Sequence, residues 1–441
     1  MSRSASDVSV VTVNWNGKDH LETLLPSLAV LEPREIILVD NGSSDGSQDF
    51  VRTRHPAVRI VQNETNRGFA QPNNLAAEVA QGRYLAFVNN DMRVDSKWIT
   101  AALARLSGSV VCAGSRILDW AGEKIDFNGS SLQYLGYALQ RETGEPWRSV
   151  ESPDRILFPC GGAMVIEREV FRQVGGFDEE YFAIYEDVDL GWRLWLAGYE
   201  VAFAPDSIAF HKGHGTFKTQ ANEKMRYLMH RNAMLTVFKN YEEEIFRKIF
   251  PLAIVLAVKR AVLFSGVDRE RFYLWARSRQ RLEESDPAAC AQILDALNHL
   301  VAVDDVLDRL PVLLEKRARI QAMRKRPDAE IFPFFVDPFR QIVENSEYLA
   351  VERSHLEGLE LTELFKPLAC PTAPSDPVRD FRDKVAELRR ELAGLQSLES
   401  QAVLHPAGVS KPGVRQFLRT WRNQGFTTAW RRFLEHVERG L

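Results

Sequence analysis

Two clusters of acidic and amide side chains in this sequence have types and spacing that could do chemistry. The first is Asn89-Asn90-Asp91, which follows an apolar run at 86–88. A carboxylate just past the end of a buried strand can hold a divalent cation, and such a cation neutralises the charge that grows on a departing diphosphate. The same residue types are also ordinary turn formers, so a plain turn is the alternative.

The second cluster contains three carboxylates, at Glu186, Asp187 and Asp189. Neighbouring carboxylates raise each other's pKa, which can tune one of them as a base, and Asp187 is suited to take a proton from a hydroxyl group. The alternative is structural, because acidic residues favour the first turn of a helix. Arg193 stands four residues after Asp189, the spacing of an ion pair on one helix face.

Two further segments are rich in polar side chains. His211 and His214 stand in a glycine-rich stretch, and imidazole is a common ligand of transition metals, although a structural histidine is the alternative. Asp40 follows an apolar run, where a carboxylate can accept hydrogen bonds from a base or ribose. The alternative for this segment is a turn and a helix N-cap made by Ser43 or Asp45.

The elements that must position these side chains alternate between strand-like and helix-like patterns. The predicted strands cover 8–14, 35–39, 58–62 and 84–88, and the predicted helices cover 18–31, 47–54 and 72–80. Continuously apolar strands alternating with helices predict an α/β fold with a mostly parallel sheet covered on both faces. Ligands bind beyond the carboxyl ends of such strands, where the polar clusters after the first, second and fourth strands fall.

The rest of the chain changes in character. Residues 112–160 are predicted to be irregular β structure, and helices are predicted at 223–241 and 245–264 and in the charged region from 269 onward. The predicted domains are therefore a catalytic domain at 1–240, a helical region at 241–366, and a proline-rich linker with C-terminal helices at 367–441.

Three of these helical segments have alternative interpretations. The apolar helix at 245–264 either packs between domains or lies on a membrane surface. The segment at 415–441, rich in arginine and aromatic residues, has the same two alternatives. The heptad-like spacing at 380–398 either joins subunits into a homo-oligomer or forms a hairpin within one chain.

Composition excludes several classes of protein. The chain has 441 residues and a net charge of −4, which argues against a nucleic-acid binder. Its four cysteines form no CxxC pair, so we expect neither a zinc site nor a disulfide framework, and a cytoplasmic location. No signal peptide or membrane span is expected, because no apolar run is long enough.

Taken in order, the motifs resemble the family 2 glycosyltransferases, which have a GT-A fold. The resemblance covers roughly residues 7–240. Its first half rests on VSVVTVNWNG, EIILVDNGSSDGS, NETNRGFAQPNNLA and YLAFVNNDMRVDSKW. Its second half rests on GGAMVIEREVFRQVGGFDEEYFAIYEDVDLGWRLWLAGYEV and FAPDSIAFHKGHGT. Several motifs in the right order are far more specific than any one of them.

The resemblance implies a role for each matching position. It assigns the nucleotide sugar to Asn14, Asp40, Arg67, Asn74, Asn89 and Asn90. It assigns Mg²⁺ or Mn²⁺ to Asp91 and His211, and catalysis to Asp187 as the base beside Glu186. It places the acceptor near Gly161, Gly162 and Trp192, although packing is the favoured interpretation of Trp192.

The implied reaction is a single inverting displacement. A nucleotide-diphosphate sugar would donate to a hydroxyl of a glycan or lipid-linked acceptor, which would favour peripheral contact with the inner face of the membrane. Asn89 stands where the family often has the first acid of a DxD motif. Members similar to rhamnosyltransferases commonly have Asn there, which favours dTDP-rhamnose.

Two alternatives remain open. One is a nucleotide-sugar-binding or scaffold protein without turnover, which Asn89 favours and Asp91, Asp187 and His211 oppose. The other is a nucleotidyltransferase, which would carry a glycine-rich basic loop where this chain has Asn14 and its neighbours.

Overall fold

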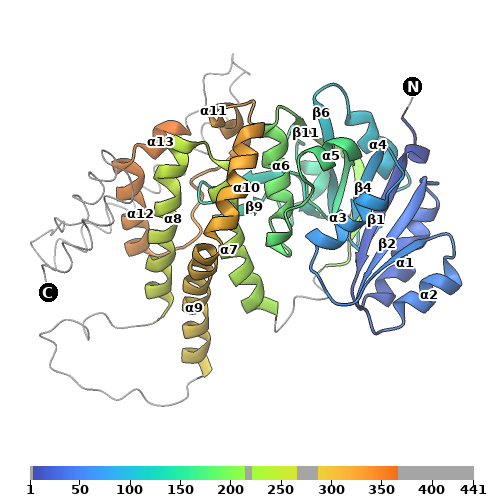
Figure 1. The fold of residues 1–441 in the computed structure, drawn as a ribbon, viewed down its shortest axis with the longest axis horizontal. Helices are drawn as coiled ribbons and strands as arrows, with labels where there is room; N and C mark the ends of the chain where they lie inside the picture. Colours follow the sequence, from blue (N-terminus) through green and yellow to red (C-terminus); the bar gives the residue numbers. More distant parts are fainter. Residues whose placement is uncertain (1–2, 214–220, 266–286, 366–441) are drawn as a thin grey trace, which may run out of the picture. The chain divides into compact units, whose positions relative to one another are not determined.

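The computed structural model describes residues 3–213, 221–265 and 287–365, and Met1–Lys366 form one compact unit. Strands and helices alternate in its first part (Figure 1). The parallel strands there are β1 (Val8–Asn14), β2 (Glu35–Asn41), β3 (Arg59–Asn63) and β4 (Tyr84–Val88), in the order β3-β2-β1-β4. All five residues of β4 are buried, as a strand of a sheet covered on both faces requires.

The sheet continues beyond β4 in mixed directions, in the order β4-β10-β6-β11-β5, with β7 beside β6. These strands are β5 (Met92–Val94), β6 (Val110–Asp119), β7 (Ile125–Phe127), β10 (Ala163–Glu167) and β11 (Glu200–His211). Strands β6 and β11 run in the direction of β1, whereas β10, β5 and β7 run against it. The predicted mostly parallel α/β sheet is confirmed, because six of its nine strands share one direction.

Residues 112–160 have the predicted irregular β character. Short strands β8 (Ser130–Leu132) and β9 (Ala138–Gln140) form a separate two-stranded sheet. This region carries β7 to the edge of the large sheet, next to β6, so that its side chains reach the end of β11.

The helices of the sheet region are mostly short and amphipathic. They are α1 (Lys18–Ala29), α2 (Ser47–Arg54), α3 (Ala70–Val79), α4 (Trp98–Arg105), α5 (Arg168–Gln173) and α6 (Glu186–Leu196). Helix α1 buries Leu21, Leu24, Leu25 and Leu28, the spacing of one helix face. Helix α6 is buried on nearly every side, which makes it a central element of the fold.

A mainly helical region follows the sheet, as predicted. Its longer helices are α7 (Ala221–Asn240), α8 (Glu243–Phe264), α9 (Pro287–Asp308), α10 (Leu310–Met323) and α12 (Ser346–Gly358). Short α11 (Asp328–Ile331), η5 (Phe332–Phe335) and α13 (Leu361–Leu364) complete it. Helix α7 contacts α6, α8, α9 and α10, so it joins the helical region to the sheet region. The domain boundary near residue 240 stays a prediction, and the segments predicted at 367–441 lie outside the described ranges.

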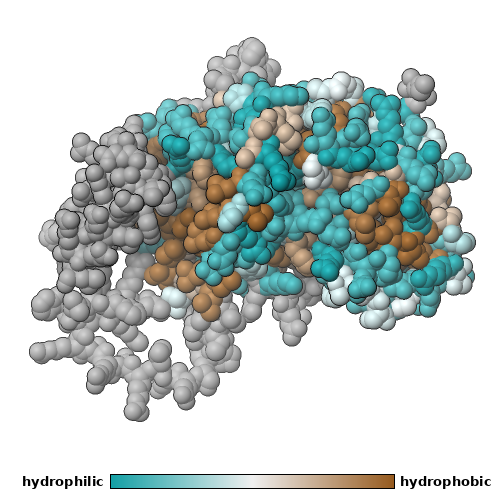
Figure 2. Space-filling view, viewed as in Figure 1, coloured by the Kyte–Doolittle hydropathy of each residue, from teal (hydrophilic) through white to brown (hydrophobic). Residues whose placement is uncertain are grey.

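Helix α8 packs against neighbouring helices along one face. Ile249, Leu252 and Leu256 are buried, whereas Val255 and Val258 are exposed. Apolar surface is visible in this part of the molecule (Figure 2), to which α9 also contributes exposed leucines. Among helices in the part of the chain that the structure describes, none is long and apolar enough to cross a membrane.

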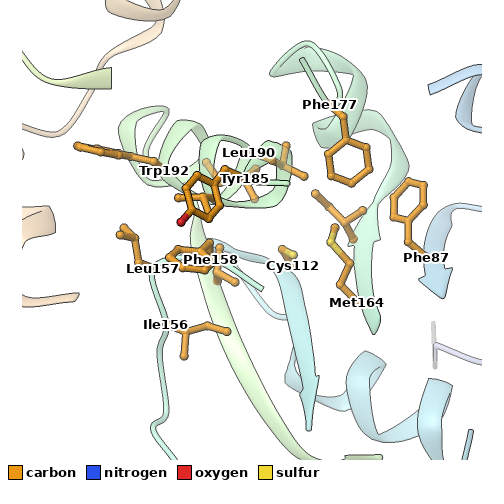
Figure 3. Close-up of a cluster of buried hydrophobic side chains, with 14 of the residues drawn as sticks. Phe87, Cys112, Ile156, Leu157, Phe158, Met164, Phe177, Tyr185, Leu190 and Trp192 are labelled. Atoms are coloured by element: carbon orange, nitrogen blue, oxygen red, sulfur yellow. The ribbon is translucent and has the colours of Figure 1, made fainter. Parts of the chain in front are cut away.

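An aromatic cluster fixes α6 in place. Figure 3 shows Trp192 and Tyr185 of this segment among buried apolar side chains that include Phe158. The Trp192 ring meets the rings of Tyr241 and Phe335 edge to face, with centroids 4.8 and 5.2 Å away. Such pairs add stability beyond the area they bury. The cluster therefore holds the start of α6, and the carboxylates on it, against the helical region.

Candidate active site

Two asparagine side chains join the loop after β4 to the loop after β1. Asn90 Nδ2 donates to Asn14 Oδ1 at 2.9 Å, and Asn14 Nδ2 donates to Ser43 Oγ at 3.2 Å. Gly17 lies against both asparagines, since a Cβ there would stand 2.3 Å from Asn90 Nδ2. The carboxyl ends of β4, β1 and β2 are thus tied together at one edge of the sheet, the place where such sheets bind ligands.

Asp40 ends β2 in a buried position and uses one carboxylate oxygen to hold its own loop. Oδ1 accepts hydrogen bonds from the Ser43 amide at 3.0 Å, Gln48 Nε2 at 2.9 Å and Gln62 Nε2 at 2.8 Å. Burial acts to raise the pKa of Asp40, but these hydrogen bonds outweigh it and hold the pKa below its ordinary value. Oδ2 is also buried and accepts none from the residues described, so a ligand donor would have to enter the loop to reach it.

Asn41 organises the loop that carries Arg67. Its Oδ1 accepts from Asn63 Nδ2 at 3.1 Å and from the Arg67 amide at 3.0 Å, and its Nδ2 donates to the Gly68 carbonyl at 2.8 Å. The Arg67 side chain is exposed and available to a ligand. Sequence reasoning gave Asn41 no role, because an asparagine before glycine looks like any turn former.

Asn74 joins α3 to the segment before α6. Its Nδ2 donates to the Phe177 carbonyl at 2.8 Å and to Glu179 Oε1 at 3.1 Å, and its Oδ1 accepts from the Phe177 amide at 2.9 Å. The structure therefore gives Asn74 a structural contact. Its contact with a nucleotide stays a prediction.

Gly161 and Gly162 bring the two halves of the site together. The Asn89 amide donates to the Gly162 carbonyl at 3.0 Å, and the Gly161 amide donates to Asp187 Oδ2 at 2.8 Å. A Cβ on Gly162 would lie 2.9 Å from Asn89 Nδ2, and one on Gly161 would lie 3.3 Å from Asp187 Cβ. Only residues without side chains allow the end of β4 and the start of α6 to approach this closely.

Glu186 and Asp187 open α6 in different environments. Burial, with the charge of Asp187 added, raises the pKa of Glu186 well above its ordinary value. Burial also raises the pKa of Asp187, but the amides of Gly161 and Val188 donate to its carboxylate and oppose the shift. Burial therefore favours the protonated form of Glu186, whereas the two amides favour the ionised form of Asp187.

Asp91 and His211 lie side by side, as the sequence motifs imply, and Asp126 joins them. His211 Nε2 lies 3.1 Å from Asp91 Oδ2, and its Nδ1 lies 2.7 Å from Asp126 Oδ2. Three neighbouring pairings, β5 with β11, β11 with β6 and β6 with β7, create this contact. Burial acts to lower the pKa of His211, but the hydrogen bonds and charges of the two carboxylates raise it to about 10.

The donor set fits a divalent cation held by two protein side chains. Asp91 Oδ1 is buried and has no hydrogen-bond partner among the described residues. An imidazole beside a carboxylate suits Mn²⁺, and carboxylate oxygen suits Mg²⁺. No group of three or more His, Cys, Asp or Glu side chains within the described ranges is arranged around an ion, so a cation here would need further ligands from substrate phosphates and water.

Asp189 and Trp192 lie in the core. Arg193 Nε meets Asp189 Oδ2 at 2.8 Å with both side chains almost fully buried, which confirms the ion pair that the spacing allowed. Trp192 has no exposed surface, so in this structure its ring offers no face to an acceptor sugar, and packing accounts for it.

Besides Asn41, sequence reasoning gave no role to Trp15 and Asp126 at this edge. Trp15 is 48% exposed between Asn14 and the loop glycine, and a large apolar side chain within a polar strand-end loop was the available signal. Asp126 carried no signal, because it stands 85 positions from His211 in irregular β structure. Only the order of the strands makes the two neighbours.

Two family models match the chain. Residues 9–175 match the model described as glycosyl transferase family 2, and residues 134–276 match the one described as glycosyl transferase family group 2. Together these matches span the sheet, the loops at its carboxyl edge and the helix that follows β11.

Curated relatives and a solved structure are also similar to the chain. N-acetylglucosaminyl-diphospho-decaprenol L-rhamnosyltransferase of Mycobacterium tuberculosis is 29% identical over 244 residues, which are 48% of this chain and 78% of the relative. The O-antigen biosynthesis protein RfbC of Myxococcus xanthus is 28% identical over 51% of this chain and 19% of the relative. The structure of S. aureus TarS 1-349 aligns with a TM-score of 0.42 at 17% identity, over 80% of this chain and 91% of that one.

Proposed function

The chain belongs to the family 2 glycosyltransferases, and we propose that it transfers one sugar from a nucleotide-diphosphate sugar to an acceptor hydroxyl with inversion. One observation carries the proposal: Gly161 and Gly162 link the Asn89 segment to Asp187 through two hydrogen bonds. A phosphate-binding edge and a proton acceptor thereby face one reaction site, as a single displacement requires.

The nucleotide side of the site is assigned to the polar edge of β1, β2 and β4. Asp40 offers an ionised carboxylate with an unused oxygen to a base or ribose donor, and exposed Arg67 offers charge to phosphate. The hydrogen bond between Asn14 and Asn90 fixes the loops after β1 and β4 relative to each other. These contacts support nucleotide binding at the carboxyl ends of β2, β1 and β4, away from Asp187.

Asp91 and His211 would hold the divalent cation. When bound, the cation neutralises charge on the leaving diphosphate. Asp126 accepts a hydrogen bond at His211 Nδ1 and so fixes the orientation of the ring, with Nε2 directed toward Asp91. A comparison of the affinities for Mg²⁺ and Mn²⁺ would show which of the two cations this site prefers.

Asp187 acts as the base. The proton of the acceptor hydroxyl passes to its carboxylate, and the acceptor oxygen bonds to the anomeric carbon. The bond from that carbon to the diphosphate breaks, and its electron pair leaves with the nucleotide. Burial and the charge of Asp187 raise the pKa of Glu186 well above its ordinary value, which makes Glu186 less suited than Asp187 to take the proton.

The donor we favour is dTDP-rhamnose. Asn89 stands in place of the first acid of the family's motif, and a relative of 29% identity is named a rhamnosyltransferase that acts on a diphospho-decaprenol substrate. The name of the same relative supports a glycan or lipid-linked acceptor. Membrane contact was predicted from the helix at 245–264, which the structure describes as α8, and from 415–441, which lies outside the described ranges together with the heptad-like segment 380–398. Membrane contact, self-association and the cytoplasmic location stay predictions.

The decisive experiment uses Asp187→Asn. The variant should lose transfer while it binds the donor nucleotide sugar with wild-type affinity, measured by calorimetry in the presence of Mn²⁺. Turnover at the wild-type rate would contradict the base assignment. Donor binding by the wild-type chain without transfer to any acceptor glycan tested would favour a binding or scaffold protein instead.

A further inference from the structure

The segment directly before the base has an unusual backbone. Phe182 has φ +61° and ψ −62°, Ile184 has φ +72°, and Tyr185 has φ +70°. The Ala183 amide donates to the Tyr181 carbonyl at 2.7 Å, which closes a three-residue γ-turn of the rare, strained kind. A β-branched isoleucine at positive φ is also an outlier. Such backbone persists only where its surroundings hold it.

Asn232 of α7 makes the largest number of side-chain hydrogen bonds to this segment among the contacts described below. Its Nδ2 donates toward the carbonyls of Ile184 at 2.6 Å, Ala183 at 2.9 Å and Tyr181 at 3.1 Å. The side chain is fully buried. A buried amide is costly unless it is hydrogen-bonded, and these carbonyls are the partners that hold it here.

Arg231, the neighbouring residue, reinforces the same contact. Its Nη2 donates to the carbonyls of Glu180 at 2.6 Å and Tyr181 at 3.0 Å. Asp305 of α9 holds this arginine, since its Oδ2 accepts from Arg231 Nη1 at 3.4 Å and from the Tyr227 hydroxyl at 2.7 Å. The strained segment is therefore fastened to two helices of the helical region.

Asn232 is the first residue of a buried polar stripe on α7. Thr236 and Asn240 follow at intervals of four, which places all three on one helix face, and none is exposed. The Thr236 hydroxyl pairs with the Tyr181 hydroxyl at 2.8 Å, and Asn240 Nδ2 donates to Asp189 Oδ1 at 3.0 Å. Each member thus contacts either the strained segment or the helix that carries the base.

The opposite side of the segment is held by α3. The Phe182 carbonyl accepts from the amides of Phe69 at 2.6 Å and Ala70 at 3.3 Å. Gly68 allows this approach, since a Cβ there would lie 2.2 Å from the same carbonyl oxygen. The strained turn is therefore clamped between the nucleotide side of the fold and α7.

We propose that Asn232 is a positioning residue of the transfer reaction. It holds the strained segment 181–185 in the one conformation that sets Asp187 against the Gly161 amide, and it touches no substrate itself. This inference rests on the proposed function of Asp187. The residues that position the base therefore include Asn232 of α7, which lies outside the motif that carries Asp187.

The test compares Asn232→Ser with Val237→Ala in the full 441-residue chain. Val237 is a fully buried residue of the same helix without a polar contact to the segment, so its truncation controls for lost packing. Asn232→Ser should lower kcat roughly tenfold, because small misplacements of a reacting group cost at least that much. Its donor affinity should stay within about twofold, and amide exchange at 180–187 should become faster. Val237→Ala should leave both kcat and that exchange near wild type.

A second variant tests whether backbone strain is the cause. Glycine adopts positive φ without penalty, so Ile184→Gly in the Asn232→Ser background should recover part of the lost kcat. Unchanged kcat in Asn232→Ser, or a loss equal to that of Val237→Ala at equal thermal stability, would overturn the proposal. If instead Asp187→Asn keeps its turnover, the base assignment fails on its own, whatever the Asn232 variants show.

Discussion

The Gly161 amide nitrogen lies 2.8 Å from Asp187 Oδ2 and donates a hydrogen bond to it. The two residues stand 26 positions apart, on the chain entering β10 and on the first turn of α6. The bond orients the carboxylate and favours its charged form, against the burial that favours the neutral one. The pKa of a base that must be both ionised and shielded from water depends on this balance between the hydrogen bond and burial.

The acid limb of the pH profile should report Asp187. Because burial raises the pKa of this base, kcat/KM should fall with decreasing pH at a midpoint above about 4, the ordinary value for aspartate. The reason is that the ionised form is the active one and is lost as pH falls through the raised pKa. Initial rates from pH 4 to 8 at saturating metal would measure it.

Glu186→Gln serves as the matched control for that profile. Glutamine mimics a protonated glutamate, the form in which burial holds Glu186. The variant should therefore keep its turnover and its acid limb. Loss of activity in Glu186→Gln, together with retained activity in Asp187→Asn, would show that Glu186 and not Asp187 is the base.

Asp126→Ala should weaken metal binding. The variant removes the acceptor that orients His211 through Nδ1, and loss of such a partner typically costs about tenfold to a hundredfold in metal affinity. Mn²⁺ titration followed by paramagnetic resonance, with nucleoside diphosphate present, measures this without turnover. Glu123→Gln removes one exposed charge from the same segment and should leave Mn²⁺ affinity unchanged. An equal loss of affinity in both variants would show that the change in net charge, and not the orientation of His211, weakens Mn²⁺ binding.

Asp178→Asn should destabilise the fold. Asp178 pairs with Lys239, which is fully buried, and with Lys316. Breaking a buried pair on one side costs about 3–5 kcal/mol, because the partner charge is left uncompensated. The loss should lie at the lower end of this range, because Lys239 would keep Asp189, 2.8 Å away, and the face of the Tyr181 ring. Urea unfolding at pH 7 would measure the loss.

The same pair predicts the direction of its pH dependence. Burial acts to raise the pKa of Asp178, but the charges of Lys239 and Lys316 outweigh it and lower the pKa well below its ordinary value. Its stabilisation is therefore present above about pH 4 and is lost as pH falls further. The gap between wild type and Asp178→Asn should shrink on acidification. Glu169→Gln, which removes an exposed carboxylate, should match wild type throughout.

Trp192→Ala should cost about 3–5 kcal/mol of stability, the usual range for a large aromatic residue lost from a core. Trp192→Phe should recover most of that stability by thermal unfolding and should leave the acceptor KM unchanged. A selective rise of the acceptor KM in Trp192→Phe, without loss of stability, would instead show that the ring contacts the acceptor.

The sheet was largely predictable because its signals are local. The strands 8–14 and 84–88 and the helix 47–54 have the predicted bounds, since apolar runs and helical periodicity depend on neighbouring residues alone. The predicted helix at 18–31 ends at Ala29, two residues early. Helix ends depend on capping contacts and are less sharply encoded than helix interiors.

The order of the strands was not predictable in the same way. Strands β10, β5 and β7 run against the rest. The places of β10 and β5 follow from pairings across long stretches of chain, whereas β7 pairs with β6 close by in the sequence. This arrangement decided that Asp126 reaches His211 and that Gly161 reaches Asp187. Asp126 shares neither a motif nor a helix face with His211. Gly161 belongs to the same motif stretch as Asp187, but it stands 26 positions before it, and only the fold brings the two into contact.

By itself, the sequence determined the family, the polar edge of the sheet and the carboxylates placed there, because motif order and strand periodicity are properties of the chain. The tertiary structure alone decided how Glu186 and Asp187 differ, since burial and the Gly161 amide act through space. It also decided that Trp192 lies in the core and that Asn232 contacts the strained turn before the base. Those contacts depend on how α6 and α7 pack, and packing joins residues that the linear order keeps apart.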